Sequence, residues 1–482
     1  MTNTNMKTYS ITTTLPYVNA DPHVGFALEI VQADALARYH RGLGETVVFN
    51  TGTDEHGLKI YQKALEAGME PKAYCDMYAA KIDRLKGALN LTYTHFIRTT
   101  DEHHVAAAQE FWKRCAANGD VYKKEYAVKY CVGCELEKTD SELVDGRCPD
   151  HPNRELDKVE EENWFFRWSN YQEKLLALYD ARPDFVAPKE RLNEIRSFVA
   201  AGLNDFSISR RKEKMPWGVP VPGDDTQVMY VWFDALVNYI STLGWPDASG
   251  DFAAAWPAVQ VAGRDNLRQQ SAMWQAMLMS AGVAPSQQIF IHSYITAEGQ
   301  KMSNSLGNVI NPYYIVAEYG TDAVRFYLLG SLPSHNYGDY ARVQMELAYA
   351  KLANGLGNLV SRVSAMANKY FDGDITPTPI IETEPKLAAA MADYDFRAYV
   401  DAVWAWVDCG NKKIDDDAPF KLVKTDAPAA KKSLEDVAGY VIAVAKALEP
   451  IIPDASAKIL ASYRADHVDV VTPLFPRREE TK

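Results

Sequence analysis

The chain has 482 residues, of which 47% are hydrophobic and 24% are charged, an average composition for a folded protein. This composition excludes a disordered or collagen-like chain, and at about 150 residues per domain the length predicts about three domains. The net charge of −13 argues against a protein that binds nucleic acid through its overall charge, although a local basic patch can still hold RNA.

The sequence carries no signal for a membrane or for secretion. Its apolar runs, such as Tyr440–Ala445, are far shorter than the roughly 20 residues that a membrane-spanning helix needs. Residues Met1–Tyr9 are polar and lack the apolar centre of a signal peptide, and six cysteines are too few for a disulfide framework. We therefore expect a cytoplasmic protein with no membrane partner.

The first 118 residues alternate between strand-like and helix-like segments. The β-rich segments are Tyr9–Thr14, Thr46–Asn50 and Thr94–Arg98. The segments with helical periodicity are Gly25–His40, Leu58–Ala67 and Val105–Asn118. Strands that alternate with helices predict a parallel sheet.

The alternation of strand-like and helix-like segments stops at about residue 119. Short strands and many charges occupy residues 121–165, and a stretch rich in Gly and Pro, Met215–Asp225, closes this region. Strand–helix alternation then resumes, with strands predicted at Gln227–Trp232 and Ile289–Ile295 and a helix at Ser271–Ser280.

From about residue 340 to residue 470 the pattern is helical throughout. The simplest interpretation is one α/β domain in two halves, residues 1–118 and 226–340, that is split by an insertion at residues 119–225. An all-α domain at residues 341–482 follows.

The first motif with a chemical meaning lies where the first strand ends and a helix begins, at Leu15–Phe26. A helix N-terminus offers unpaired N–H donors and a partial positive charge, which suit a phosphate group. Within the motif, His23 can donate a hydrogen bond to phosphate, and Gly25 lets a ligand approach the backbone. Taken alone, this pattern is no more than a strand–loop–helix turn.

The second motif is the loop Lys301–Ser305, which follows the strand predicted at Ile289–Ile295. A loop with a lysine and hydroxyl groups suits a pyrophosphate leaving group, because the group gains negative charge as it leaves. A surface loop has the same composition, so the motif is weak by itself.

The third motif is a set of possible metal ligands, Cys131-x2-Cys134-x13-Cys148-x2-His151. Two close pairs separated by a short loop have the spacing of a zinc knuckle, in which thiolates and an imidazole complete a tetrahedron. Four protein ligands leave no open position on the metal. The spacing therefore predicts structural Zn²⁺.

Together, the first two motifs resemble the HIGH and KMSKS signatures of class I aminoacyl-tRNA synthetases. Four further segments look like methionyl-tRNA synthetase: Leu15–Tyr17, Thr51–Gly57, Trp232–Leu236 and Gly263–Asp265. The resemblance implies a Rossmann-type parallel-sheet catalytic domain, split by the zinc-containing insertion and followed by a helical anticodon-binding bundle. It also implies a ligase that joins L-methionine to tRNA(Met), with ATP as substrate and Mg²⁺ accompanying ATP.

The resemblance further implies residues for each substrate. The methionine pocket would be formed by Leu15, Tyr17, Asp54, Trp232, Ala235, Tyr239 and Gln270, with Asp54 holding the substrate ammonium. The ATP site would be formed by His23, Gly25, Glu29, Gly263, Asp265, Lys301, Ser303 and Asn304. Among these, the catalytic residues would be His23, Lys301 and Asn304. Without the family context, Trp232 and Tyr239 read as ordinary core residues.

In the helical region, Asn358 and Arg362 are four residues apart and share one face of a helix, and Phe420 follows a proline. Reading unstacked bases requires edge hydrogen bonds and stacking, which these side chain types provide. The resemblance implies that all three read the anticodon. Considered alone, they are ordinary residues of a helix surface.

The chain departs from the family pattern at four positions. The second His of the HIGH motif is Phe26, the second Lys of the KMSKS motif is Asn304, a pocket His is Gln270, and an aliphatic residue nearby is Asn266. An alternative is therefore a catalytically silenced paralogue that binds tRNA or regulates. The intact pocket residues favour the enzyme, and we expect a monomer.

Overall fold

The structure is a computed structural model that describes residues 7–134, 136–138, 143–247, 251–302, 308–380, 385–476 and 478. The chain forms two compact units. Unit 1 comprises Met1–Pro22, Glu45–Arg84 and Tyr93–Ile291, and unit 2 comprises His23–Gly44, Leu85–Thr92 and His292–Lys482. The boundaries of these two units differ from those of the four segments predicted from the sequence. The segment boundaries stay predictions.

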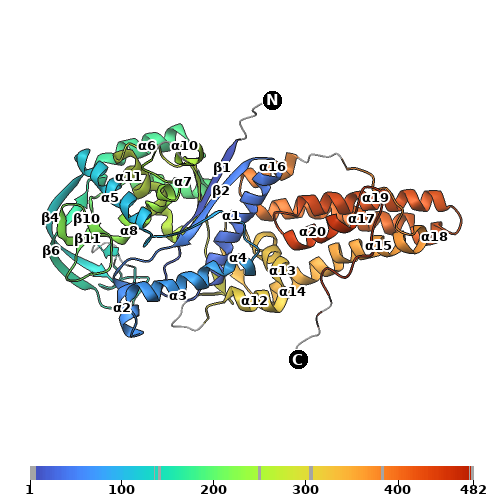
Figure 1. Ribbon diagram of the computed structural model, residues 1–482, viewed down its shortest axis with the longest axis horizontal. Helices are drawn as coiled ribbons and strands as arrows, with labels where there is room; N and C mark the ends of the chain where they lie inside the picture. The colour runs from blue at the N-terminus through green and yellow to red at the C-terminus, as the bar shows by residue number, and fades with distance from the viewer. Residues whose placement is uncertain are drawn as a thin grey trace. The chain divides into compact units, whose positions relative to one another are not determined.

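The centre of unit 1 is a six-stranded sheet with the strand order β3-β2-β1-β12-β13-β7. Figure 1 labels two of its strands, β1 and β2. Its strands are β1 (Thr8–Thr13), β2 (Thr46–Thr53), β3 (His95–Arg98), β7 (Val186–Ala187), β12 (Val259–Gly263) and β13 (Gln288–His292). The pairs β1–β2, β1–β12, β2–β3 and β7–β13 are parallel, as the sequence predicted. Because β1 pairs with β12, strands from both sides of the insertion lie in one sheet, which confirms a single interrupted α/β domain.

Helices account for much of the rest of unit 1. They are α2 (Leu58–Glu66), α3 (Pro71–Asp83), α5 (Glu102–Ala117), α6 (Gln172–Ala181), α7 (Lys189–Ala200), α8 (Val231–Ala235), α9 (Asn238–Ser241), α10 (Asp251–Ala255) and α11 (Trp274–Ser280). The core of the unit is aromatic: Phe111 of α5 stacks on Trp274 of α11 with ring centroids 5.5 Å apart. Offset stacking of this kind adds to the burial of two large apolar side chains.

The insertion is built on long strands, where the sequence predicted short ones. β4 (Val121–Cys131) pairs antiparallel with β6 (Asp157–Phe166) along ten residues of each strand. The short strands β5 (Leu136–Lys138) and β8 (Phe206–Ser207) complete this sheet. A separate sheet consists of β9 (Ser209–Arg211), β10 (Pro220–Val221) and β11 (Asp224–Met229).

Two predicted strands were wrong in part. The strand predicted at Gln227–Trp232 ends at Met229, and Trp232 lies in the helix α8. The strand predicted at Ile289–Ile295 ends at His292, and Ile295 begins another strand in another sheet. Short apolar runs do not distinguish a strand from a buried helical turn, and only the tertiary contacts decide where the chain turns.

Unit 2 contains the long helix α1 (Val24–Gly42), the short helix α4 (Leu85–Ala88) and a small sheet of β14 (Ile295–Ala297), β15 (Gln300–Lys301) and β16 (Gly338–Tyr340). Its other α-helices are α12 (Pro312–Tyr319), α13 (Thr321–Phe326), α14 (Arg342–Lys351), α15 (Asn358–Phe371), α16 (Pro385–Ala392), α17 (Phe396–Asp417), α18 (Pro419–Leu422), α19 (Ala427–Ala447) and α20 (Pro453–Ser462). α19 packs on α15, α17 and α20, and Figure 1 shows these helices side by side. The predicted all-α region is confirmed.

Within the described residues, no helix is both long enough and apolar enough to cross a membrane.

Candidate active site

The segments that follow β1 and β2 lie side by side at the carboxyl edge of the parallel sheet. Tyr17 and Asp54 form a parallel bridge, in which Asp54 N donates to Pro16 O at 3.1 Å and Val18 N donates to Asp54 O at 3.2 Å. Leu15, Tyr17 and Asp54 are all half-buried. Because ligands of open α/β sheets bind at the carboxyl ends of the strands, this edge is where a small substrate belongs.

Two short helices of unit 1 carry further residues of the predicted methionine pocket. Trp232 is half-buried and Ala235 is buried on α8, while Tyr239 is buried on α9. Asn50 of β2 donates from Nδ2 to Asn238 Oδ1 of α9 at 3.1 Å. This bond fixes α9 to the strand that leads to Asp54, so the structure brings these predicted residues together in one unit.

Gln270 stands where the family resemblance led us to expect a histidine. Its side chain is buried, its Nε2 donates to the hydroxyl of Tyr239 at 2.7 Å, and its Oε1 accepts from Gln260 Nε2 at 3.2 Å. Gln275 donates from Nε2 to the carbonyl of Gln270 at 2.8 Å. Both ends of the Gln270 amide are hydrogen-bonded, so the residue orients Tyr239 without adding a titratable group to the pocket.

A buried cluster beside these helices was not singled out from the sequence. The carboxylate of Asp234 accepts from His56 Nδ1 at 2.6 Å and from His104 Nε2 at 2.7 Å. Burial by itself raises the pKa of a carboxyl group, but the two imidazoles lower the pKa of Asp234 to about 2. The sequence feature that could have indicated this cluster is its position next to predicted pocket residues. His56 lies two residues after Asp54, and Asp234 lies two residues after Trp232.

The residue directly after Asp54 is also fixed. Glu55 is fully buried and receives a two-pronged contact from Arg98, at 2.6 Å from Nε and at 2.9 Å from Nη2. The hydroxyls of Thr53 and Thr100 donate to the same carboxylate at 2.6 and 2.5 Å. Paired contacts between a guanidinium and a carboxylate are strong and directional, so the backbone on both sides of Asp54 is held in place.

In unit 2, His23 is the N-cap residue of α1. Its Nδ1 accepts a hydrogen bond from Gly25 N at 3.0 Å, which leaves the ring proton on Nε2 as a donor. A Cβ atom at Gly25 would lie 2.8 Å from the His23 ring, so a larger residue there would displace the ring from this position. The imidazole is exposed, and its N–H suits a phosphate group. The first two N–H groups of α1 are engaged within the protein, Val24 N with Ile310 O at 2.9 Å and Gly25 N with His23.

Two other side chains of α1 are buried. Phe26, which replaces the second His of the HIGH motif, is buried and has no donor to offer. Glu29, which the resemblance assigns to ATP, is 4% exposed, and His292 Nε2 lies 3.0 Å from its Oε2. Glu29 and His292 both lie in unit 2, and His292 precedes the small sheet that contains Lys301.

The remaining residues predicted for ATP are distributed over both units. Gly263 is buried at the end of β12, and Asp265 is exposed in the turn that follows it. Lys301 ends β15, and its side chain is not described. Ser303 and Asn304 lie outside the described residues.

The four predicted zinc ligands converge. The three Sγ atoms and one imidazole nitrogen all lie within 4.8 Å of one another, at Cys131, Cys134, Cys148 and His151. His151 Nδ1 lies 3.2 Å from Cys134 Sγ and 3.8 Å from Cys131 Sγ. Zinc–sulfur bonds of about 2.3 Å in a tetrahedron place ligand atoms about 3.8 Å apart, so these residues fit Zn²⁺. A Cβ atom at Gly133 would lie 2.5 Å from the His151 ring, so the glycine makes room for that ligand.

The residues predicted to read an anticodon all lie in unit 2. Asn358 is exposed at the start of α15, and Arg362 on the same helix pairs with Asp415 near the end of α17 at 2.9 Å. Phe420 is 41% exposed on α18, which follows α17 directly. An aromatic ring that is this exposed is available for stacking.

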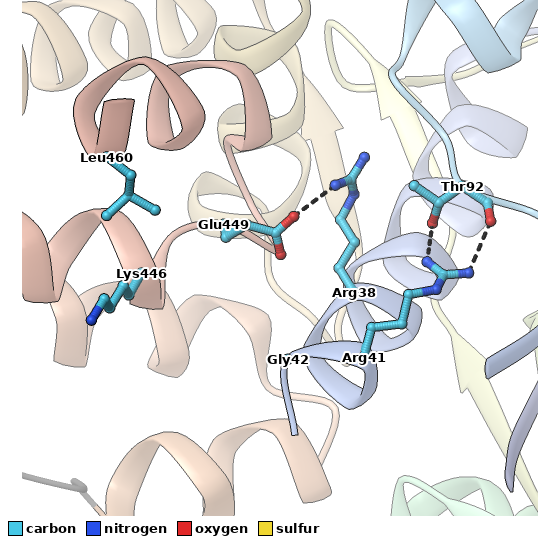
Figure 2. Close-up of a pocket in the computed structure, with 7 residues that line it drawn as sticks. All are labelled: Arg38, Arg41, Gly42, Thr92, Lys446, Glu449 and Leu460. Atoms are coloured by element: carbon cyan, nitrogen blue, oxygen red, sulfur yellow. Dashed lines mark hydrogen bonds and ion pairs between the residues drawn. The ribbon is translucent and has the colours of Figure 1, made fainter. Parts of the chain in front are cut away.

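A cavity of about 520 Å³ in unit 2 lies at the C-terminal end of α1. It is lined by Arg38, Arg41, Gly42, Thr92, Lys446, Glu449 and Leu460. Figure 2 shows Arg38 reaching across to Glu449, with an Nη1–Oε1 distance of 2.8 Å, while Arg41 donates to both oxygens of Thr92. None of the described residues that line this cavity was assigned to a substrate. Its two arginines, Arg38 and Arg41, belong to α1 and hold it through Glu449 and Thr92.

Comparisons with known proteins agree with this geometry. The family model "tRNA synthetases class I (M)" matches residues 9–161 and 152–364. The methionine–tRNA ligase of Thermosynechococcus vestitus is 42% identical and covers 94% of this chain and 89% of its own length. That of Mesorhizobium japonicum is 40% identical and covers 94% and 90%.

Solved structures give the same result. Mycobacterium tuberculosis methionyl-tRNA synthetase in complex with methionyl-adenylate matches with a TM-score of 0.91 and 36% identity. The match covers 98% of this chain and 100% of that structure. The agreement of fold, sequence and family model over nearly the whole chain places it in the class I tRNA synthetases (M), the family of the methionine–tRNA ligases.

Proposed function

We infer that this protein is a methionine–tRNA ligase. It activates L-methionine with ATP, forms methionyl-adenylate and pyrophosphate, and then transfers methionine to the 3′ end of tRNA. The observation that carries this conclusion is the 42% identity to a methionine–tRNA ligase over 94% of the chain. The relatives reported above are named as ligases, which gives no support to a silenced paralogue.

The chemistry needs positioning and charge stabilisation more than proton transfer. A methionine carboxylate oxygen attacks the α-phosphorus of ATP, a new O–P bond forms, and pyrophosphate leaves with the electrons of the broken P–O bond. A ribose hydroxyl of the terminal adenosine then attacks the methionyl carbonyl, and AMP leaves. Reactions of this type gain most from in-line orientation and from donors aimed at the developing charge. Mg²⁺ accompanies ATP and offsets the charge of its phosphates.

For methionine, we propose an apolar and aromatic slot with one carboxylate. Leu15, Tyr17, Trp232 and Ala235 would contact the thioether chain, which gains from contacts between sulfur and aromatic rings. Gln270 would orient Tyr239 in the same slot. Asp54 would pair with the ammonium group, supported by its half-buried position between two anchored neighbours.

For ATP, we propose that His23 and Gly25 meet the phosphates at the N-terminus of α1, while Gly263 and Asp265 meet the nucleoside, with Asp265 on the ribose hydroxyls. Lys301, Ser303 and Asn304 would contact the leaving pyrophosphate. Glu29 belongs to this set by resemblance, and its burial against His292 favours a role in holding α1.

The tRNA partner would be tRNA(Met), read by Asn358, Arg362 and Phe420 in the helical region. Cys131, Cys134, Cys148 and His151 would hold Zn²⁺, which supplies structural cross-linking and no reaction step because its four positions are filled. A monomeric state and the segment boundaries 1–118, 119–225, 226–340 and 341–482 belong to the same proposal.

Methionine-dependent exchange between ATP and pyrophosphate tests the function. The wild-type protein is expected to catalyse it, and a protein without exchange would contradict a ligase. In Asp54→Asn, kcat/KM for methionine should fall about 100-fold or more, because a charge-assisted contact to the ammonium is lost. The matched control is Asp180→Asn, which removes an exposed carboxylate of α6. An unchanged methionine KM in Asp54→Asn would exclude Asp54 from the pocket.

A further inference from the structure

The cluster of Asp234, His56 and His104 joins the elements that carry the proposed methionine pocket. His56 belongs to the loop after β2 that contains Asp54, and Asp234 lies on α8. His104 lies on α5, and its Nδ1 is 2.9 Å from Ser241 Oγ on α9. One chain of hydrogen bonds therefore runs from the Asp54 loop through α8 and α5 to α9, the helix of Tyr239.

The hydrogen positions in this chain follow from the carboxylate. Asp234 is fully buried and ionised at neutral pH, so it can only accept hydrogen bonds. His56 Nδ1 and His104 Nε2 must then carry protons. His104 Nδ1 continues the chain through its hydrogen bond with Ser241 Oγ at 2.9 Å.

A buried carboxylate is costly unless several donors satisfy it, and an apolar side chain would fill the same volume at lower cost. What the carboxylate provides in return is a fixed geometry for its donors. Its donors are imidazole N–H groups from two different elements, each within 2.7 Å. Such short contacts to a charged acceptor leave little freedom for the loop of Asp54 relative to the helix of Trp232.

We propose that Asp234 is a positioning residue of the methionine site and acts through His56 and His104. It holds the carboxylate loop of Asp54 against the aromatic helices α8 and α9, so that methionine meets a preformed pocket. This inference rests on the proposed function. None of the three residues contacts substrate in this proposal, and the effect is expected on methionine binding while ATP binding is spared.

Matched substitutions at the two histidines test the proposal. His56→Asn keeps a donor at the position of Nδ1, and His104→Gln keeps one near Nε2, while His56→Leu and His104→Leu remove them. In methionine-dependent exchange, each leucine variant should raise the methionine KM tenfold or more and change the ATP KM less than twofold. The Asn and Gln variants should stay within about threefold of wild type for methionine.

Several outcomes would overturn the positioning role. One is a leucine variant that folds and keeps the wild-type methionine KM, and another is an equal rise in both KM values. A purely structural role would lower the unfolding temperature and the active fraction without changing the methionine KM. If the leucine variants do not fold, Ser241→Ala removes only the last bond of the chain and should still raise the methionine KM two- to threefold, and an unchanged value would refute the proposal. Exchange by the wild-type protein distinguishes failure of the positioning role from failure of the proposed function. A wild type without exchange would refute the ligase function.

Discussion

Among the described residues, each unit has one aspartate with no exposed surface, Asp234 in unit 1 and Asp34 in unit 2, and the two have different partners. In unit 1, Asp234 accepts from two imidazoles. In unit 2, Asp34 on α1 accepts from Arg38 Nε at 2.9 Å, lies 2.8 Å from Arg325 Nη2, and accepts from the backbone N of Thr92 at 2.6 Å. Although burial acts in the opposite direction, the two guanidinium groups lower the pKa of Asp34.

The arginines of unit 2 do more than neutralise Asp34. Arg325 is fully buried and donates to the carbonyls of Leu89, Pro450 and Ile451 at 2.8 to 3.0 Å. One guanidinium thereby fastens α13 to α1, to the segment after α4 and to the segment before α20. A permanent cation with five donors is suited to such a junction, because its charge and geometry do not change with pH.

The cluster of unit 1 uses donors without a fixed positive charge. A guanidinium beside Asp234 would bring a permanent cation close to the pocket in which we propose that the methionine ammonium binds, and like charges repel. An imidazole can satisfy the same carboxylate in its neutral form, which avoids this repulsion. The comparison shows a scaffold of guanidinium contacts around Asp34 in unit 2. In unit 1, imidazoles surround Asp234, and a permanent ion pair is kept at the neighbouring Glu55.

Breaking the scaffold should have the largest effect on stability. In Arg325→Met, Asp34 loses one cation and three carbonyls lose their donor, so we expect a loss of about 3–5 kcal/mol in the free energy of unfolding. Denaturant unfolding would measure it. The control Arg342→Met removes an exposed ion pair with Glu318 and should cost less than about 1 kcal/mol. Equal effects of the two substitutions would show that Arg325 is not a junction.

A second test concerns Asp322, which is buried on α13 beside Arg325. Burial raises its pKa to about 6 from an ordinary value of 3.8. A carboxyl group with a raised pKa in the folded state contributes stability that is complete below pH 3.8 and is lost as the pH rises through about 6.

Asp322→Asn removes this pH dependence. The stability of wild type minus that of the variant should therefore fall by up to about 3 kcal/mol between pH 4 and pH 7.5, since each pKa unit corresponds to about 1.4 kcal/mol. Thermal unfolding of both proteins across this range measures the difference. A difference that does not vary with pH would contradict the raised pKa.

A smaller loss of stability is expected when one arginine is replaced by a residue that keeps the positive charge but has fewer donors. Arg38→Lys keeps a cation next to Asp34, but a lysine cannot also reach Glu449 and Asn90, to which Arg38 donates at 2.8 Å each. We expect a loss of about 1–2 kcal/mol in unfolding free energy. Lys446→Met, which removes an exposed cation from the same cavity, should change stability by less than about 0.5 kcal/mol.

The smallest change in stability is expected at Arg362. Its ion pair with Asp415 is exposed, so Arg362→Ala should alter the unfolding free energy by less than about 0.5 kcal/mol. Aminoacylation of tRNA should nevertheless fall, while methionine-dependent exchange is spared. Comparable losses in both assays would contradict a role in reading the anticodon.

Much of the site was predictable because it depends on local sequence. The presence of β1, β2 and α1 could be read from periodicity, although β2 continues three residues past its predicted end, to Thr53. Parallel strands bring their carboxyl ends to one edge of the sheet. Tyr17 and Asp54 therefore had to be neighbours once the strands were known. The convergence of the Cys and His ligands was predictable for the same reason, since their spacing alone brings them close.

Other features of the site could be established only from the folded structure. Trp232 was predicted in a strand and lies in a helix, because a short apolar run fits both. The buried contact of Glu29 with His292 joins residues 263 positions apart, and no local pattern reports such a distance.

The sequence by itself determined the family, the split α/β domain and the residues that carry the proposed chemistry, because these follow from motifs and periodicity within short windows. Only the tertiary structure decided which buried charges meet. Asp234 has the same local appearance as any helical aspartate, and its two histidines lie 178 and 130 positions away in the chain. A buried charge is tolerated only where the fold brings it donors, so its partners are a property of packing.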